Sequence, residues 1–475
     1  MFGRNSIHES GANPIVRQAS AVEGDAKERG ARTYVYLVSA VAALGGLLFG
    51  FDTAVINGAI VFLRRDFHLS DFQTEWAAGS LLLGCVIGAF AGGSLSDRLG
   101  RKKLLLAAAS IFVLSAFGAA LPKNLAEFIA ARLLGGLAIG VVSALSPLYI
   151  AEISPPSIRG RLVTLNQLAI VTGILCAFFI NWLLASLGPH SWRWMFMAAS
   201  VPSLVFFFSL LAVPESPRWL IQRSRLKEAV TILSWLCGDE QAPLQVEEIR
   251  KTIAEEQAYS LSALLRPPLR HPTMIAVTLA VLSQVTGINT IMYYGSVIFT
   301  EQVKSQGAFS ALGANVIIGA VNFAGTILAL LFIDRLGRKP LLMFSAGGMG
   351  ISLTAIGFAF LVHPAPSTLI LGLILSYVAC FAVGLGPGSW LLMSELFPTP
   401  VRGRAMSIAT LSLWVACLVV TLTFLSLVSL LGASEAFGIY ALLCAVAFFF
   451  VWKFTPETKG KALEQIERLW VGHQG

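Results

Sequence analysis

Two short charged motifs each occur twice in this chain, at nearly the same separation. Asp97-Arg98-Leu99-Gly100-Arg101-Lys102 returns as Asp334-Arg335-Leu336-Gly337-Arg338-Lys339, 237 residues later. A Glu, six further residues and Arg-Gly-Arg run from Glu152 to Arg161 and again from Glu395 to Arg404, 243 residues later. Every copy lies between long apolar stretches. The chain is therefore predicted to contain two related halves, each of which enters an apolar phase several times.

The composition shows that this apolar phase is a membrane. Of the 475 residues, 56% are hydrophobic and only 13% are charged, whereas soluble proteins are about 25% charged. Runs of 18 or more mostly apolar residues recur, and each is long enough to cross ~30 Å of hydrocarbon as a helix. The sequence therefore argues against a soluble enzyme. We identify about twelve spans, near 34–62, 75–96, 103–121, 126–151, 164–187, 193–213, 272–299, 308–333, 341–362, 367–394, 406–431 and 435–454.

The distribution of basic residues predicts the orientation of these spans. The N-terminal segment and the loops after every even-numbered span are rich in Arg and Lys, and this accounts for the net charge of +8 without nucleic-acid binding. By the positive-inside rule, these segments and both termini face the cytoplasm. No Asn-x-Ser/Thr sequon occurs, which favours a bacterial inner membrane over a glycosylated plasma membrane. The opposite loops hold only Arg64, Arg65, Lys123, Arg193 and Lys304.

The repeat also predicts the architecture. Because each half has an even number of spans, the halves are parallel, related by an axis along the membrane normal, with a cavity between them. The expected fold is an all-α membrane protein of twelve transmembrane helices in two six-helix bundles, with short cytoplasmic helices. The predicted organisation is a disordered cytoplasmic tail (1–33), the first bundle (34–213), a cytoplasmic helical linker (214–271), the second bundle (272–455) and a cytoplasmic C-terminal tail (456–475).

Asp52 is a lone carboxylate well inside an apolar span. Burying it ionised is costly, so it must either pair with a cation or bind a proton. Arg132 is the one cation inside the fourth span, and counting from the span ends places it at a depth comparable with that of Asp52. A nearby Arg favours the ionised carboxylate, and its withdrawal favours the proton. The pair is predicted to be a proton switch; the alternative is a static ion pair between two helices.

Other polar and aromatic side chains in the spans suit a ligand with many hydroxyls and an apolar C–H face, such as a sugar. Lone amides in membrane helices are costly unless they are satisfied. We therefore expect them to face the cavity, with hydrogen bonding between helices as the alternative. The residues are Gln167, Gln284, Asn289, Asn322, Trp390 and Trp414.

The two repeated charged loops, 97–102 and 334–339, are short and therefore bring the neighbouring helix ends together. Asp97 can cap or pair at a helix end, while the Arg side chains reach carboxylates on adjacent helices; plain positive-inside charge is the alternative. At these loops the chain resembles the major facilitator superfamily. The motifs Pro214-Glu215-Ser216-Pro217-Arg218 and Pro456-Glu457-Thr458-Lys459-Gly460 narrow the resemblance to the sugar porter family, as do Gly45 to Ala54 and Arg132 to Gly136. The chain looks like bacterial sugar–proton symporters and, more distantly, like glucose facilitators.

The resemblance assigns expected roles to individual residues. Gln167, Gln284, Asn289, Asn322 and Trp390 match sugar-contacting positions. Phe49, Gly386 and Trp414 would line the pocket, and Asp52 stands where symporters carry Asp and facilitators carry Asn. The chain departs from the family pattern at Ser283, Leu413 and Ile174, each of which weakens a possible hydroxyl contact.

The resemblance also implies gates. Tyr293 and Tyr294 resemble an outer gate, and Pro387 in Gly386-Pro387-Gly388 would let a half-helix bend at an inner gate; ordinary packing is the alternative for both. A cytoplasmic charge network would latch the two halves together when the cavity opens outward, or alternatively would only anchor helix ends. Its members are Asp97, Arg98, Arg101, Glu152, Arg159, Glu215, Arg218, Asp334, Arg335, Arg338, Glu395, Arg402 and Glu457.

The sequence therefore predicts a secondary active transporter. It would carry a monosaccharide, a hexose or a pentose, by alternating access in symport with protons, as a monomer in the lipid bilayer. We expect no covalent chemistry, cofactor, metal or nucleotide: none of the six Cys forms a CxxC pair, and no GxxxxGK[ST] loop occurs. The alternatives are a proton-independent facilitator, a transporter of another polyol such as inositol, and a sugar sensor, which would need a longer signalling tail than the roughly 20 residues after the last span.

Overall fold

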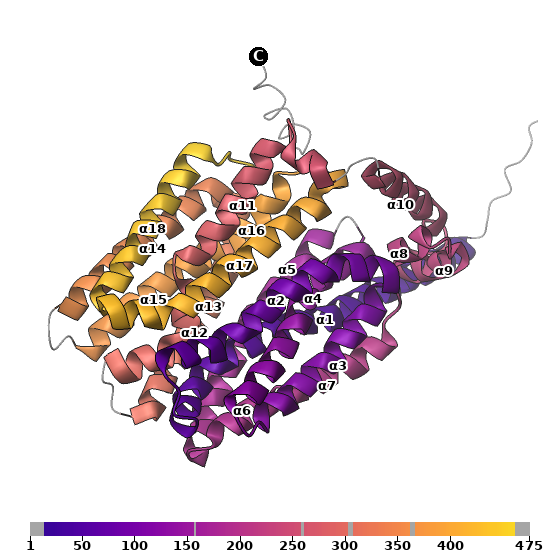
Figure 1. The fold of residues 1–475 in the computed structure, drawn as a ribbon. Coiled ribbons are helices and arrows are strands. Elements are labelled where there is room, and N and C mark those ends of the chain that lie inside the picture. The colour runs from indigo at the N-terminus through magenta and orange to yellow at the C-terminus, as the bar shows by residue number, and fades with distance from the viewer. Residues whose placement is uncertain (1–13, 156–157, 258–260, 303–306, 362–365, 461–475) are drawn as a thin grey trace, which may run out of the picture.

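The computed structural model describes residues 14–155, 158–257, 261–302, 307–361 and 366–460. Every regular element in these ranges is helical (Figure 1). Twelve spans among these residues are long and apolar enough to cross a membrane, and they coincide with the predicted ones to within a few residues at most ends. The predicted all-α membrane fold is confirmed.

Glycines at the helix crossings of the first half allow its helices to pack closely. A Cβ on Gly50 would lie 1.9 Å from the carbonyl oxygen of Ile170, and one on Gly136 would lie 1.9 Å from that of Leu81. Only glycine permits these backbones to approach so closely. The helices are α1 (Pro14–Asp66), α2 (Asp71–Leu99), α3 (Arg101–Ala120), α4 (Leu125–Ile153), α5 (Arg159–Leu184) with η1 (Ala185–Leu187), and the pair α6 (Ser191–Ala198) and α7 (Ser200–Ala212).

The second half contains two interrupted spans. Gly287, with φ of 90°, separates α11 from α12, and the hydroxyl of Tyr377 donates to the freed carbonyl of Thr286 at 2.9 Å. Gly384 separates α15 from α16, and the freed Leu385 N–H donates to Ser345 Oγ at 3.0 Å. The helices are α11 (Arg270–Val285), α12 (Ile288–Val297) with the π-turn η3 (Ile298–Gln302), α13 (Gly307–Leu336), α14 (Arg338–Leu361), α15 (Ser367–Val383), α16 (Leu385–Glu395), α17 (Thr399–Leu431) and α18 (Ala433–Phe454).

The linker forms short helices, as its pattern of charges and apolar residues predicts: α8 (Pro217–Gln222), α9 (Leu226–Cys237), α10 (Ala242–Gln257) and η2 (Leu261–Leu265). The N-terminal tail differs from the prediction of disorder, because α1 already begins at Pro14. Its Ala, Glu, Lys and Arg residues favour helix and continue the first span. Residues 1–13 and 461–475 of the two predicted tails lie outside the described residues.

The two halves lie side by side (Figure 1). Three helix pairs form the seam between them: α1 with α12, α2 with α17, and α5 with α13. We call the end that carries the loops 97–102 and 334–339 and the helices α8–α10 the basic end. The other end is called the opposite end.

Candidate functional site

The structure places Asp52 and Arg132 in direct contact in the first half. Arg132 Nη1 donates to Asp52 Oδ1 at 2.6 Å, and Nη2 donates to the Asp52 carbonyl at 3.0 Å. Arg132 is completely buried and Asp52 is 6% exposed. The guanidinium also lies 5.2 Å from the ring centroid of Phe196. The carboxylate in α1 is thus neutralised by the cation of α4, as their predicted depths require.

Gly135 of α4 makes room for this pair, and sequence reasoning missed it. A Cβ there would lie 2.9 Å from Asp52 Oδ2 and 2.4 Å from Ser115 Oγ. Oδ2 is buried and has no hydrogen-bond partner among the described residues. One oxygen of Asp52 therefore binds the cation, while the other is buried without a hydrogen bond to any described residue. The doublet Gly135-Gly136 was the only sequence signal for this position.

Two of the predicted sugar-binding amides meet across the break between α11 and α12. Asn289 Nδ2 donates to Gln284 Oε1 at 2.5 Å and to Cys417 Sγ at 3.1 Å. Gln284 Nε2 donates to Ser283 Oγ at 3.2 Å. The contact with Cys417 on α17 joins two helices, so part of this cluster also serves packing. Cys417 was not predicted, because a buried thiol in an apolar span looks like any small core residue.

Aromatic residues predicted to line the pocket meet across the seam. The ring of Phe49 on α1 lies 5.3 Å from that of Trp414 on α17. Phe49 is half-buried, and Trp414 is buried with its indole Nε1 unpaired within the described part of the chain. The first half and the second half thus share an aromatic contact beside an unused donor.

The remaining predicted pocket residues lie on α5, α13 and α16. Gln167 and Asn322 occupy helices that pack against each other across the seam. Neither side-chain amide has a hydrogen bond to another described residue, which leaves both free to bind a ligand. Gly386 and Trp390 lie on α16, just after the helix break, and both are half-buried. Within the described part of the chain, none of these four residues is hydrogen-bonded to Gln284 or Asn289.

The predicted gate residues Tyr293 and Tyr294 pack against α17. The Tyr294 hydroxyl donates to the Thr421 carbonyl at 2.8 Å, and its ring stacks on Phe424 with centroids 5.6 Å apart. The Tyr293 hydroxyl lies 3.9 Å from Cys417 Sγ. Pro387 is buried within the first turn of α16.

At the opposite end, Asn57 of α1 joins the halves. Its Nδ2 donates to the Met292 carbonyl at 2.8 Å, and its Oδ1 accepts the Ser296 N–H at 3.0 Å. In an unbroken helix that N–H donates to that carbonyl. The Asn57 amide thus binds both a backbone acceptor and a backbone donor of α12. Sequence analysis did not select Asn57, although it is a lone amide like those that it did select.

Glu75 of α2 makes a second bridge at this end, to Ser426 of α17. Its Oε1 accepts the Ser426 N–H at 2.8 Å, and its Oε2 accepts the Ser426 hydroxyl at 2.7 Å. Glu75 was also missed.

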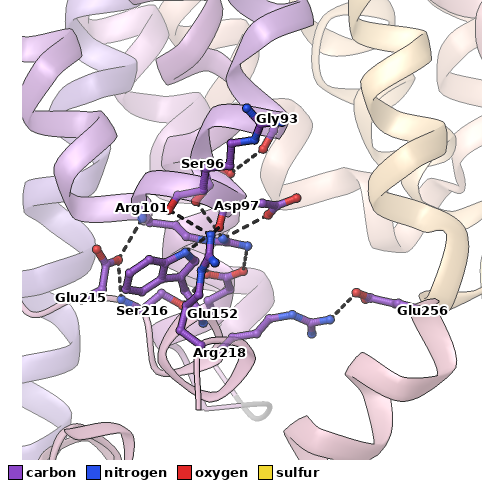
Figure 2. A network of polar contacts seen from close by, with 12 residues as sticks. Gly93, Ser96, Asp97, Arg101, Glu152, Glu215, Ser216, Arg218 and Glu256 are labelled. Atoms are coloured by element: carbon purple, nitrogen blue, oxygen red, sulfur yellow. Dashed lines mark hydrogen bonds and ion pairs between the residues drawn. The ribbon is translucent and has the colours of Figure 1, made fainter. Parts of the chain in front are cut away.

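At the basic end, the first copy of the repeated loop forms a buried charge network (Figure 2). Arg101 Nε and Nη2 each donate to the Glu152 carboxylate at 3.0 Å, and Nη1 donates to Asp97 at 3.2 Å. Glu215 Oε1 accepts the backbone N–H groups of Arg101 and Lys102 at 2.9 and 3.1 Å, which caps the N-terminus of α3.

The second copy repeats this geometry. Arg338 donates to Glu395 at 3.2 and 2.9 Å and pairs with Asp334 at 2.9 Å. Glu457 caps α14 by accepting the N–H groups of Arg338 and Lys339 at 3.1 and 3.0 Å. Partial burial raises the pKa of Glu457, but the backbone N–H groups around it outweigh burial and hold the pKa below its ordinary value.

The glycine of each repeated loop explains why these caps form. Gly100 and Gly337 have φ of 97° and 95°, a region that side chains with a Cβ rarely adopt. A Cβ on Gly100 would also lie 2.4 Å from Glu215 Oε2. Ser216 and Thr458, which follow the capping glutamates, donate to Glu152 and Glu395 at 2.5 Å each.

The comparisons with known proteins agree with this duplicated geometry. The family model described as sugar (and other) transporter matches residues 38–470. This chain belongs to the sugar porter family of the major facilitator superfamily.

Named relatives of this sugar porter span nearly its whole length. It is 40% identical to an arabinose-proton symporter of Bacillus subtilis (92% of this chain, 95% of the relative). It is 39% identical to a glucose transport protein of Synechocystis (91% and 97%) and 35% identical to a major myo-inositol transporter of B. subtilis (93% and 95%). Among solved structures, the xylose transporter of Escherichia coli in a partially occluded inward-open conformation is 35% identical, with a TM-score of 0.81 over 90% of this chain and 100% of that chain.

The predicted latch at the basic end does not join the halves of this sugar porter. Among the residues that the structure describes, the hydrogen bonds and ion pairs of the thirteen network residues stay within one half or reach only the linker. Arg159 donates to the Ser154 carbonyl at 3.4 Å and Arg402 to that of Phe397 at 3.2 Å. Arg218 pairs with Glu256 of α10 at 2.5 Å (Figure 2). Asn57 and Glu75 bridge the seam at the opposite end, whereas the network at the basic end makes no hydrogen bond or ion pair between the two halves among the described residues.

Proposed function

We propose that this sugar porter is a secondary active transporter that carries a monosaccharide, a hexose or a pentose, by alternating access in symport with protons. The observation that carries the proposal is the buried Asp52–Arg132 pair, which has one free carboxylate oxygen and lies one helical turn from the Phe49–Trp414 contact across the seam. The arabinose-proton symporter supports proton coupling, because it aligns with 92% of this chain and is named for that coupling.

The proton would act through Asp52. Protonation of Oδ2 removes the charge that holds Arg132, so the attraction between α1 and α4 falls. Phe49 precedes Asp52 by three residues on the same helix, so a shift of α1 at the carboxyl group is carried to the seam at Trp414. Proton binding and the arrangement of the two halves are coupled in this way.

The sugar would bind at the seam between the halves. Gln167 and Asn322 offer amides with free hydrogen-bonding capacity, and Asn289 and Gln284 offer a preorganised pair. Trp414 offers an indole N–H that has no protein partner among the described residues. Indole faces of Trp390 and Trp414 suit the C–H face of a sugar ring. Gly386 would leave space beside Trp390.

We infer the membrane orientation from charge. The basic end would face the cytoplasm, together with both termini, in a bacterial inner membrane. The bridges at the opposite end would then close the outer side, and the basic-end network would latch the halves in the outward-open state. Tyr293, Tyr294 and Pro387 would move as gates. The chain would act as a monomer in the bilayer, without covalent chemistry or a cofactor.

A second candidate is transport of a polyol such as inositol, with or without protons. The myo-inositol transporter among the relatives favours it, because its chain aligns over 93% of this one. A cyclic polyol presents the same hydroxyls and C–H faces as a sugar.

Uptake by purified protein in proteoliposomes tests both candidates. Labelled arabinose, xylose, glucose and myo-inositol are each offered with and without an inward pH gradient. The proposal expects gradient-driven accumulation of at least one monosaccharide. Accumulation of inositol alone would favour the second candidate, and equal uptake without the gradient would favour a facilitator.

The variant Asp52→Asn tests the proton step. It keeps the shape and removes the titration, so uphill uptake should be lost while exchange of labelled for unlabelled sugar persists. Asp66→Asn is the control, since Asp66 is an acid at the opposite end that contacts His190 and Trp192 of its own half. Uphill uptake by Asp52→Asn would show that coupling does not run through Asp52.

A further inference from the structure

We propose that Glu75 is a latch residue, which holds the two halves together at the opposite end and releases them when the seam opens there. The inference rests on the alternating access of the proposed function. It concerns neither the sugar contacts nor the proton-binding pair, and it adds a positioning residue to the transport cycle.

Both oxygens of the Glu75 carboxylate accept a hydrogen bond from the second half. Glu75 is 1% exposed, and its two oxygens accept the backbone N–H and the hydroxyl of one residue, Ser426. Both bonds are short and charge-assisted, which makes them about twice as strong as bonds between neutral groups. Two bonds to one residue also set the register of α2 along α17, which a single bond would not do.

Next to the latch, the contact between α2 and α17 is apolar. One turn further along α2, Gly79 packs against Leu422, which lies one turn before Ser426 on α17. A Cβ on Gly79 would lie 2.5 Å from Leu422 Cδ2, so the two helices touch closely at that layer. One turn earlier on α2, Asp71 pairs with Arg64 at 2.6 Å, and both belong to the first half. In this part of α2, Glu75 makes a hydrogen-bonded bridge between the halves.

A carboxylate suits a contact that must break in every cycle. Taking it out of water costs free energy, and the bonds to Ser426 offset that cost. When the seam opens, water hydrates the freed carboxylate, so the lost bonds are largely compensated. A buried apolar contact of the same area would gain nothing from water on opening. Glu75 thus fixes the closed arrangement without making it permanent.

The distance between α2 and α17 at the opposite end tests this inference. Spin labels are attached through ketone-bearing unnatural residues at Phe72 and Leu430, whose side chains are exposed; the six native cysteines stay in place. Pulsed electron paramagnetic resonance then measures the distance distribution of the full chain in lipid nanodiscs, without sugar or pH gradient. Glu75→Ala should raise the population of molecules with a long label-to-label distance, relative to those with a short one, about tenfold. Ser426→Ala, which keeps the backbone donor, should raise it less.

Asp66→Ala is the matched control, because it removes an acid at the same end whose partners lie in its own half. It should leave the distribution unchanged. An unchanged distribution in Glu75→Ala would overturn the inference. If Glu75→Ala does not yield a monodisperse protein, Glu75→Leu decides: leucine fills most of the same volume but accepts neither the backbone N–H nor the hydroxyl of Ser426, so the same shift is expected and its absence overturns the latch. Because no substrate is present, failure of the latch is distinguishable from failure of sugar transport.

Discussion

Adding one methyl group at Gly135 should disturb the ion pair on which proton coupling is proposed to depend. In the variant Gly135→Ala the new Cβ would lie 2.9 Å from Asp52 Oδ2 and 2.4 Å from Ser115 Oγ. Both separations are well below ordinary contact distances of about 3.5 Å. Ser115 can rotate away only by giving up its 2.8 Å bond to the Ala131 carbonyl, and Asp52 can retreat only by moving relative to Arg132.

The expected loss of stability follows from these contacts. Overpacking in a dense core costs about 1–3 kcal/mol, and the hydrogen bond of Ser115 contributes about 1 kcal/mol. The better helix propensity of Ala offsets about 1 kcal/mol. The net destabilisation is therefore about 1–3 kcal/mol. Complete separation of Asp52 from Arg132 would raise it toward about 3–5 kcal/mol, because each charge would then be buried alone.

The assay compares thermal unfolding of purified Gly135→Ala with that of Gly372→Ala. Gly372 lies within α15, is exposed, and has no atom within 4 Å of its would-be Cβ, so the same substitution there should be neutral or slightly stabilising. Adding Ser115→Ala to Gly135→Ala removes the hydroxyl clash and leaves the 2.9 Å approach to Asp52 as the shortest contact, beside one of 3.3 Å to the Cβ of residue 115. Gradient-driven uptake should stay impaired in that double variant. Equal melting of the two glycine variants, with unaltered uptake, would refute the reasoning.

Two further perturbations follow from the caps and bridges. The pKa of Glu457 lies below its ordinary value, so the stability that its carboxylate contributes is complete above the ordinary pKa and is lost as the pH falls through the lowered pKa. The difference in melting temperature between the wild-type protein and Glu457→Gln should therefore shrink as the pH is lowered below about 4.5. A difference independent of pH would contradict the cap. Asn57→Ala leaves the Met292 carbonyl and the Ser296 N–H of α12 without their contacts to α1, which should lower the free energy of unfolding by about 1–3 kcal/mol. The variant should also increase labelling of a cysteine introduced at Ser296 by a membrane-impermeant thiol reagent. Unchanged labelling would show that Asn57 does not hold α12.

The sequence was sufficient for the buried ion pair and for the repeated loops. Asp52 in an apolar span required a cation or a proton, and Arg132 was the one cation at a comparable depth, so their contact could be anticipated. The duplicated loops likewise indicated two copies of one local structure, and the structure contains both.

The partners of Glu75 and Asn57 could not be anticipated in the same way. Both residues bind backbone groups on helices of the other half, 351 and about 239 residues away. A backbone N–H or carbonyl exists at almost every position, so its availability leaves no mark on the sequence. The helix break at Gly384 was also displaced from the Gly386-Pro387-Gly388 motif that predicted it, because Pro387 is tolerated in the first turn of α16.

The sequence by itself determined the apolar spans, their two-fold repetition and the asymmetry of basic residues, because the length and charge of a membrane helix depend on its own side chains. Only the tertiary structure decided which end of the seam is bridged, which carboxylate oxygen is free and which charges stay within one half. These depend on how the two halves meet, and that arrangement changes in a transporter while the sequence stays the same.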